Sequence, residues 1–347
     1  MKKGVTAEFR FLRIIGKIFL PLLIIIFPFL LIAFAISPNL FSRLIRIFFN
    51  YQFKVPPKEF LYTESVSSIA DIHYGDSADE VFDLHLPSKR EGVYPLIIWA
   101  HGGAYVAGDK GYLAFFARVL AHYGYAVASI GYTLAPNGHY PEQIVQIGKA
   151  YNFLINDDYP AKEFLDTKRI FLAGDSAGAQ MMAQFALLQT NLVYRDEFIA
   201  THPDNPLPSI IPTQYLRGML LYCGPFSLKE VQASPKPLLN FLFWQMGWAY
   251  FGKRRLSNLP ALEEVDIIPH LTATFPPSFI ADGNTLSFPK QGRDLARVLR
   301  KLGVPTTELI FDDSEKKVYH EFQLDLGTPE ARQALLTALA FLKKNSI

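Results

Sequence analysis

The stretch that decides the fold is Ile170-Phe171-Leu172-Ala173-Gly174-Asp175-Ser176-Ala177-Gly178. Its first four residues form a short apolar run typical of a buried strand, and residues 177–190 are rich in helix-forming side chains. The small residues around Ser176 allow the sharp turn that a strand needs to enter a helix there. Such a turn exposes the hydroxyl at a helix N-terminus, whose dipole favours developing negative charge. The stretch therefore predicts a nucleophilic serine, a role that also requires a neighbouring base.

On both sides of this motif, short apolar runs alternate with helical stretches. Such alternation predicts βαβ units around a mostly parallel sheet that helices cover on both faces. Two alternating segments near the start, separated by Gly75-Asp76-Ser77, predict an antiparallel pair. The expected strands are 67–74, 80–86, 94–100, 126–132, 170–173, 219–223, 277–281 and 308–311, and the expected helices are 112–123, 144–155, 177–190 and 289–302.

Residues 191–274 depart from this alternation. They contain one clear strand among loops, prolines and the aromatic-rich segment 238–251. An insertion of this kind predicts a cap that contributes apolar walls to a pocket, and a peripheral packing layer is the alternative.

A second glycine motif, His101-Gly102-Gly103-Ala104-Tyr105, follows the apolar run 94–100. Glycines at this place let backbone N–H groups approach a substrate carbonyl closely. The N–H groups of Gly102, Gly103 and Ala177 are therefore predicted to form an oxyanion hole, which stabilises the transition state by several kcal/mol.

The catalytic base is predicted to be His320. Where a serine elbow carries the nucleophile, the residues follow in the order nucleophile, acid and histidine along the chain. The sequence has eight histidines, and His320 alone follows the last expected strands and helices. A surface histidine is the alternative reading.

Taken together, these motifs resemble the hormone-sensitive-lipase and carboxylesterase branch of the α/β-hydrolases. The resemblance covers about residues 69–342. It implies an α/β-hydrolase fold, hydrolysis of small or medium acyl esters through an acyl-enzyme on Ser176, and no cofactor or metal. The residues that carry it are His101-Gly102-Gly103, Asp109-Lys110, Tyr132-x-Leu134-Ala135-Pro136, Tyr140-Pro141, Gly174–Gly178, Pro276–Ile280 and His320-Glu321-Phe322.

One position departs from the resemblance. The acid of the triad is expected in the turn after the strand 277–281, where this chain has Leu286, and a leucine cannot hold or stabilise an imidazole. Asp282 is the preferred replacement, Asp312 or Asp313 is the second possibility, and a Ser–His dyad without an acid is the third. The departure keeps a non-catalytic binding protein on a hydrolase scaffold as an alternative, beside acyl transfer and peptide cleavage.

The N-terminus has a different character. Residues 18–36 lack charged side chains and are long enough, at about 1.5 Å per residue, to span a hydrocarbon core of about 30 Å. The basic segment 1–17 precedes them and predicts a cytoplasmic N-terminus with the hydrolase domain, 51–347, on the other side. Residues 37–50 are predicted to be a juxtamembrane segment with an amphipathic helix at the membrane surface, in which Arg43 and Arg46 face the lipid head groups. A cleaved signal peptide is the alternative.

The composition limits the partners. The net charge is +2 and the basic residues are dispersed, whereas a nucleic-acid partner would require a concentrated basic face. The single cysteine, Cys223, excludes a disulfide within the chain and lies in an apolar run that predicts a small core residue. A small-molecule ester is the expected substrate, with the membrane as the contact of the N-terminal helix.

Overall fold

The computed structural model describes residues 32–49, 56–62, 64–205, 207, 209–233 and 236–347. Eight strands form one sheet in the order β1-β2-β4-β3-β5-β6-β7-β8. β1 pairs antiparallel with β2, and β2 with β4, whereas all the other neighbours are parallel. The predicted sheet and its antiparallel start are confirmed. The strands are β1 Val66–His73, β2 Val81–Pro87, β3 Tyr94–Ala100, β4 Ala126–Ile130, β5 Leu165–Asp175, β6 Leu216–Tyr222, β7 Ser278–Asp282 and β8 Thr306–Ile310.

The helices lie mainly between the strands, as the alternation predicts. The four helices expected from the sequence are present with slightly different ends. The helices are α2 Asn39–Phe49, α3 Ala114–His122, α4 Glu142–Asn156, α5 Ala177–Thr190, α6 Leu192–Thr201, α7 Leu228–Gln232, α8 Pro237–Phe251, α9 Pro260–Glu264, α10 Pro289–Lys301 and α11 Pro329–Asn345, with short 3-10 turns at Lys58–Phe60, Lys110–Leu113, Lys162–Phe164, Ile268–His270 and Phe322–Leu324.

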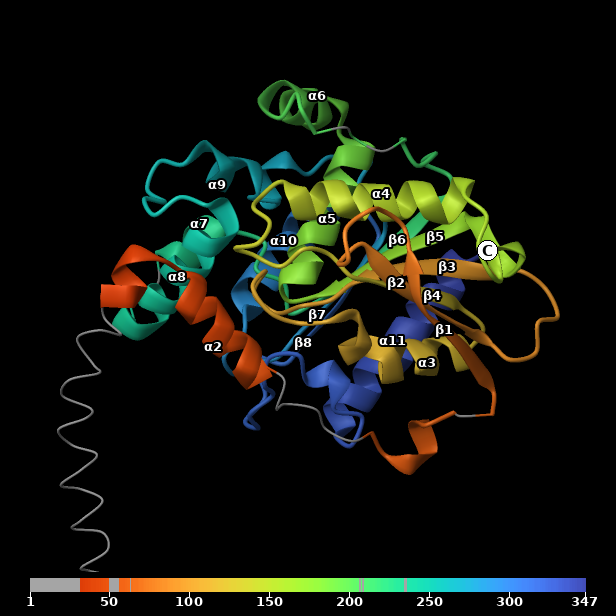
Figure 1. The fold of residues 1–347 in the computed structure, drawn as a ribbon. Helices are drawn as coiled ribbons and strands as arrows, with labels where there is room; N and C mark the ends of the chain where they lie inside the picture. Colours follow the sequence, from red (N-terminus) through yellow and green to blue (C-terminus); the bar gives the residue numbers. More distant parts are fainter. Residues whose placement is uncertain (1–31, 50–55, 63, 206, 208, 234–235) are drawn as a thin grey trace, which may run out of the picture.

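The sheet is buried between two helical layers. Along β3, Leu96 and Ile98 face a core shared with α4, α5 and α10, and Ile97 and Trp99 face a second core shared with α3 and α11. Figure 1 shows α4 and α5 on one side of the sheet and α3 and α11 on the other. Since both faces are covered, the central strands consist of continuous apolar residues. The carboxyl ends of β3, β5, β6 and β7 therefore meet at one edge, where α/β proteins place their sites.

The predicted insertion 191–274 is not a single unit. β6 lies within it and is a full member of the sheet between β5 and β7. Because β6 is continuous with the core, the part that covers the carboxyl edge is limited to α7, α8 and α9, which group at one end of the molecule in Figure 1. α8 has no polar stripe, since it packs beside α7 on one side and α2 on another.

Helix α2 belongs to the same end of the molecule. Its Phe41 and Ser42 are buried, and it packs against α8. Arg46 donates to the carbonyl oxygens of Val106 at 2.8 Å and Ala135 at 3.0 Å. Arg46 therefore anchors the helix to the hydrolase domain, and the expectation that it faces lipid head groups is wrong. The reason is that these two carbonyl oxygens, in the loops that follow β3 and β4, lie within hydrogen-bond distance of the guanidinium.

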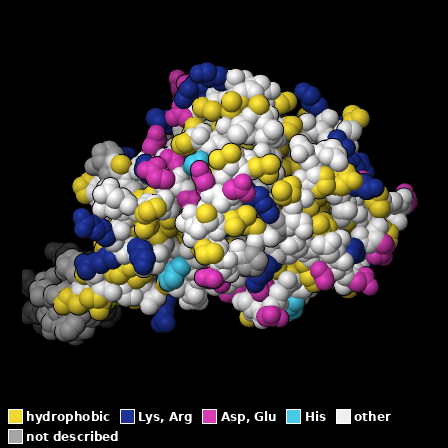
Figure 2. All heavy atoms as spheres, turned by 90° about the horizontal axis from the view of Figure 1, so that it is seen from above, with side chains coloured by type: hydrophobic (Ala, Val, Ile, Leu, Met, Phe, Trp, Pro, Cys, Tyr) yellow, Lys and Arg dark blue, Asp and Glu magenta, His cyan; other side chains and the backbone are white. Residues whose placement is uncertain are grey.

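The predicted anchor at 18–36 lies outside the described residues apart from 32–36, which are helical, and the basic segment 1–17 lies outside them entirely. Among the residues that the structure describes, no helix combines the length and the apolar character that crossing a membrane requires. On the face in Figure 2, acidic and basic side chains are interspersed, with several basic ones close together on the left.

Candidate active site

Ser176 lies in the turn between β5 and α5, with backbone angles φ 50° and ψ −121°. A positive φ is costly for a serine, and such strain persists where the surroundings hold it. The Ser176 N–H donates to the Tyr222 carbonyl oxygen at 2.8 Å. A side chain at Gly178 would place its Cβ 2.1 Å from the Ala100 carbonyl oxygen. This close approach of α5 to β3 explains why the motif requires a glycine there.

His320 reaches Ser176 from beyond the last strand. Its Nε2 lies 2.8 Å from Ser176 Oγ. Burial lowers the pKa of His320 to about 4, so the imidazole is neutral near pH 7 and able to accept a proton. Its loop is joined to the turn after β7, because the His320 N–H donates to the Thr285 carbonyl oxygen at 3.1 Å.

The other imidazole nitrogen contacts a residue that the sequence analysis missed. Ser287 Oγ lies 2.8 Å from His320 Nδ1 and donates to Asp282 Oδ1. The structure thus brings Ser176, His320 and Asp282 together, with a hydroxyl inserted between the last two. The position expected for the acid, Leu286, has φ 53° and is 75% exposed. A serine one residue beyond the expected acid was the available signal in the sequence, but its contacts depend on the conformation of the turn.

Asp282 is buried at the end of β7. Desolvation raises its pKa to about 6, although hydrogen bonds from Ser287, from Cys223 and from the backbone act in the opposite direction. The Gly283 N–H donates to Asp282 Oδ1 at 2.7 Å. The carboxylate is therefore ionised at neutral pH and held by several donors.

The remaining acid candidates face elsewhere. Asp312 accepts from Arg293 of α10, and Asp313 lies 3.6 Å from the same guanidinium. Their charges serve an ion pair on the flank of the domain, so the structure favours Asp282 over both.

The oxyanion loop differs from its predicted form in one residue. The Gly102 N–H donates to Asp175 Oδ2 at 2.9 Å. It cannot also donate to a substrate, so the assignment of Gly102 to the oxyanion hole is wrong. Within the described part of the chain, the N–H groups of Gly103, Ala104 and Ala177 have no acceptor. Gly103 has φ 118°, and a Cβ there would lie 2.0 Å from the Ala107 carbonyl oxygen.

Asp175 holds this loop in place from behind. Its Oδ1 accepts from the Trp99 indole N–H at 2.8 Å. Asp175 also contacts Glu321, and burial together with the Asp175 charge raises the pKa of Glu321 well above its usual range. Two neighbouring buried carboxyl groups cannot both ionise, so Glu321 is the protonated partner. The sequence offered no sign of this pair, because Asp175 and Glu321 belong to separate motifs.

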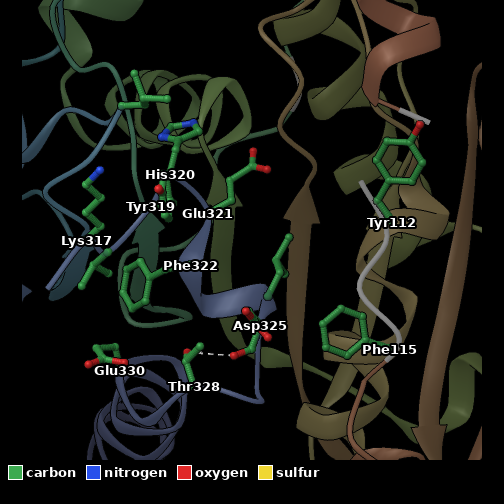
Figure 3. A pocket seen from close by; sticks show the side chains of 13 residues that line it. Tyr112, Phe115, Lys317, Tyr319, His320, Glu321, Phe322, Asp325, Thr328 and Glu330 are labelled. Carbon is green, nitrogen blue, oxygen red and sulfur yellow. Dashed lines mark hydrogen bonds between the residues drawn. The ribbon is translucent and has the colours of Figure 1, made fainter. Parts of the chain in front are cut away.

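Two pockets lie near the site, and Ser176 lines the smaller of them but not the larger. A cavity of about 60 Å³ beside Ser176 lies under α8, and its walls include Tyr105, Met246 and Phe288. The other, of about 450 Å³, lies on the side of His320 and is bordered by Leu286 and Tyr112. Figure 3 shows aromatic and charged side chains converging on this larger pocket.

One group of side chains has metal-binding potential. Cys223, Asp282 and His320 place one potential ligand atom each within 4.8 Å of one another. Asp282 and His320 already share the Ser287 hydroxyl, and the Glu321 N–H donates to Cys223 Sγ at 3.4 Å. This arrangement is engaged in hydrogen bonding and fits proton transfer between Ser176 and His320.

A mostly parallel sheet with a strained serine after a central strand, and a histidine from beyond the last strand, defines an α/β-hydrolase. The chain belongs to the family BD-FAE, whose model matches residues 82–297. The predicted place in the carboxylesterase and hormone-sensitive-lipase-like branch is confirmed.

Three similar proteins illustrate this relationship. Esterase B from Lactobacillus rhamnosis is similar in structure, with a TM-score of 0.68 and 21% identity over 89% of this chain and 93% of that one. A probable isoprenylcysteine alpha-carbonyl methylesterase of Oryza sativa subsp. japonica is 32% identical over 36% of this chain. A kynurenine formamidase of Drosophila melanogaster is 22% identical over 70% of this chain and 73% of its own length. This chain spans 29% of the length of the Oryza methylesterase.

Proposed function

We propose that the protein is a serine hydrolase of carboxylic esters, with Ser176 as nucleophile and His320 as base. The observation that carries the proposal is the 2.8 Å contact between His320 Nε2 and Ser176 Oγ, beside the unpaired N–H groups of the oxyanion loop. The names of the esterase B and methylesterase relatives agree with ester chemistry.

The reaction follows from this geometry. His320 Nε2 takes the Ser176 proton as Oγ attacks the ester carbonyl, and the carbonyl oxygen becomes an oxyanion. Gly103, Ala104 and Ala177 then donate their N–H groups to that oxygen. The protonated imidazole returns its proton to the leaving alcohol, and Ser176 remains acylated. Water deprotonated by His320 attacks the acyl group and releases the acid, which restores the serine.

The pockets suggest the class of ester. The cavity beside Ser176 measures about 60 Å³ and has mostly apolar walls, so it suits a short acyl group. The larger pocket of about 450 Å³ has both apolar and charged walls and includes His320 but not Ser176, and we infer that it takes a bulkier alcohol on the histidine side. We therefore infer short-chain acyl esters of larger alcohols as substrates.

The test uses the full-length chain in detergent. A fluorophosphonate probe reports an activated serine without any assumption about the substrate. Labelling is expected in the wild type and in His73→Ala, whose histidine is exposed, and not in Ser176→Ala or His320→Ala. Equal labelling of the Ser176→Ala variant would refute the nucleophile. Turnover of p-nitrophenyl acetate or butyrate is expected to exceed that of the octanoate.

A folded protein that neither reacts with the probe nor turns over any ester would instead support a binding scaffold. Leu286 motivates that alternative. The Ser287–Asp282 arrangement argues against it, because a charged acid still lies behind His320.

We also propose that the N-terminal segment tethers the hydrolase domain to a membrane, with the N-terminus cytoplasmic. The apolar residues 18–36 and the basic residues before them support this orientation. Exposed Leu238 on α8 and the exposed basic residues 253–255 after it lie at the same end as α2.

Two experiments test the tether and its orientation. The protein is expected to stay with membranes after alkaline extraction. A C-terminal tag is expected to be cut by protease only from the side opposite the cytoplasm. Release by alkali, or a tag cut only from the cytoplasmic side, would contradict the tether or its orientation.

A further inference from the structure

We propose that Ser287 is a positioning residue that connects His320 to Asp282, so that the acid acts through a hydroxyl and not by direct contact. This proposal rests on the proposed function, since it concerns how the same site controls its base. It is argued from three hydrogen bonds in series, which join Ser176 to His320, His320 to Ser287 and Ser287 to Asp282.

The direction of these hydrogen bonds follows from proton counting. A serine hydroxyl has a single proton, and an ionised carboxylate can only accept. Ser287 must therefore donate to Asp282, and its lone pair faces His320 Nδ1. This arrangement requires the imidazole to carry its proton on Nδ1, which leaves Nε2 free to accept the proton of Ser176. Ser287 thus selects the tautomer that the reaction needs.

The turn that carries Ser287 is held to the histidine loop by several contacts. Asn284 Nδ2 donates to the carbonyl oxygens of Phe311, Ser314 and Lys316, and Asn284 Oδ1 accepts from the Val318 N–H at 2.9 Å. These bonds and the link from Thr285 fix the distance between the Ser287 backbone and the His320 ring. The Ser287 hydroxyl is therefore held in its bridging position between His320 and Asp282.

The same turn explains why position 286 can be a leucine. With φ 53°, Leu286 directs its side chain to the exposed rim, whereas the next residue faces the ring. Asp282 is buried at the end of β7 and lies within 4.8 Å of the imidazole, too far for a direct hydrogen bond but near enough for its charge to act.

The series of hydrogen bonds from Ser176 to Asp282 also responds to the protonation of Asp282. A neutral Asp282 can donate to Ser287, which then donates to Nδ1 and places the imidazole proton on the wrong nitrogen. The titratable groups that face Asp282 are His320 and Cys223, and burial raises the pKa of the Cys223 thiol well above its usual range, so that it stays neutral. Activity is therefore expected to rise as Asp282 ionises with increasing pH.

A matched pair of variants tests the proposal in the full-length protein. Ser287→Thr keeps the hydroxyl, and Ser287→Val has nearly the shape of the threonine variant but no hydroxyl. We expect kcat for a short acyl ester within about tenfold of wild type in the threonine variant and about 100-fold or more lower in the valine variant, with KM changed by less than about threefold. Thr337→Val on α11 is the control, because it removes an exposed hydroxyl that bonds the Gln333 carbonyl oxygen of its own helix.

The pH profile of kcat/KM provides a readout that loss of packing would not move. In the wild type and in Ser287→Thr, kcat/KM is expected to decline as pH falls through the Asp282 pKa of about 6, which is the acid limb of the profile. Ser287→Val is expected to lack this acid limb. Equal activity and equal profiles in the two variants would overturn the proposal. If either variant unfolds, Ser287→Ala is compared with wild type by the same two readouts, and an unchanged acid limb overturns the proposal. Ser176→Ala separates the two hypotheses, because activity that survives it refutes the proposed function itself.

Discussion

Replacing Asp282 by asparagine removes the charge behind the histidine and keeps the shape of the side chain. In the wild type the carboxylate stabilises the imidazolium that forms when Ser176 gives up its proton. The asparagine leaves the Gly283 N–H with an acceptor, so the turn keeps one of its bonds. We expect the variant to fold and to lose activity because the charge no longer acts on His320.

The size of the loss follows from the separation. Two unit charges within 4.8 Å attract by about 3.5 kcal/mol at an effective dielectric constant of about 20. Since about 1.36 kcal/mol corresponds to a factor of ten in rate, kcat is expected to fall about 300-fold. Where the acid contacts the histidine directly, replacing it by asparagine typically lowers kcat by about 10⁴, because the imidazole tautomer is disturbed as well.

The assay is the steady-state hydrolysis of a short acyl ester between about pH 5 and 9, with thermal unfolding measured in parallel. Burial raises the pKa of Asp282 to about 6, and the ionised form is the active one, so wild-type kcat/KM should decline as pH falls through that value. The asparagine variant should lack this decline. A kcat within threefold of wild type would refute the reasoning, since the charge would then contribute nothing.

Three further perturbations follow from contacts described above. Gly103→Ala should lower kcat by about 100-fold or more and reduce Tm, because the new Cβ would lie 2.0 Å from the Ala107 carbonyl oxygen, and an active, equally stable variant would contradict the loop geometry. Glu321→Gln should stabilise the fold at pH 8 and change its stability little at pH 5. The raised pKa of Glu321 makes wild-type stability decrease as pH rises above the usual range of a glutamate, whereas glutamine does not titrate. Parallel curves of Tm against pH for the two proteins would contradict this. Arg46→Ala should lower the free energy of unfolding by about 1–3 kcal/mol in denaturant titration, whereas the exposed Arg43→Ala should change it little; equal effects would contradict the anchoring of α2.

The strand–turn–helix around Ser176 could be predicted because its signal is local. Small residues at fixed spacing determine the turn, and the alternation of apolar runs determines the sheet. His320 could be predicted from chain order alone. Asp282 remained one possibility among several, since the spacing from the last strand does not say which side chain faces the ring.

Other features depend on contacts between distant segments. Gly102 differs from Gly103 only because Asp175, more than seventy residues later, accepts its N–H. Ser287 bridges the histidine and the acid because Leu286 takes a positive φ, which no pattern of apolar residues reports. The amphipathic pattern of α2 fits a lipid surface and a protein surface equally well, and only the structure shows that Arg46 bonds two carbonyl oxygens of the hydrolase domain.

The position of α2 has a practical consequence for making the protein. A shortened chain that begins at residue 51, just after the basic and apolar N-terminal region, would lack this helix. The Val106 and Ala135 carbonyl oxygens would lose their cationic donor, and the surface of α8 that packs against α2 would be uncovered. Val106 lies three residues after Gly103, so the cut would also loosen the chain next to the oxyanion loop. A recombinant form free of the apolar segment should therefore start before Asn39, where α2 begins.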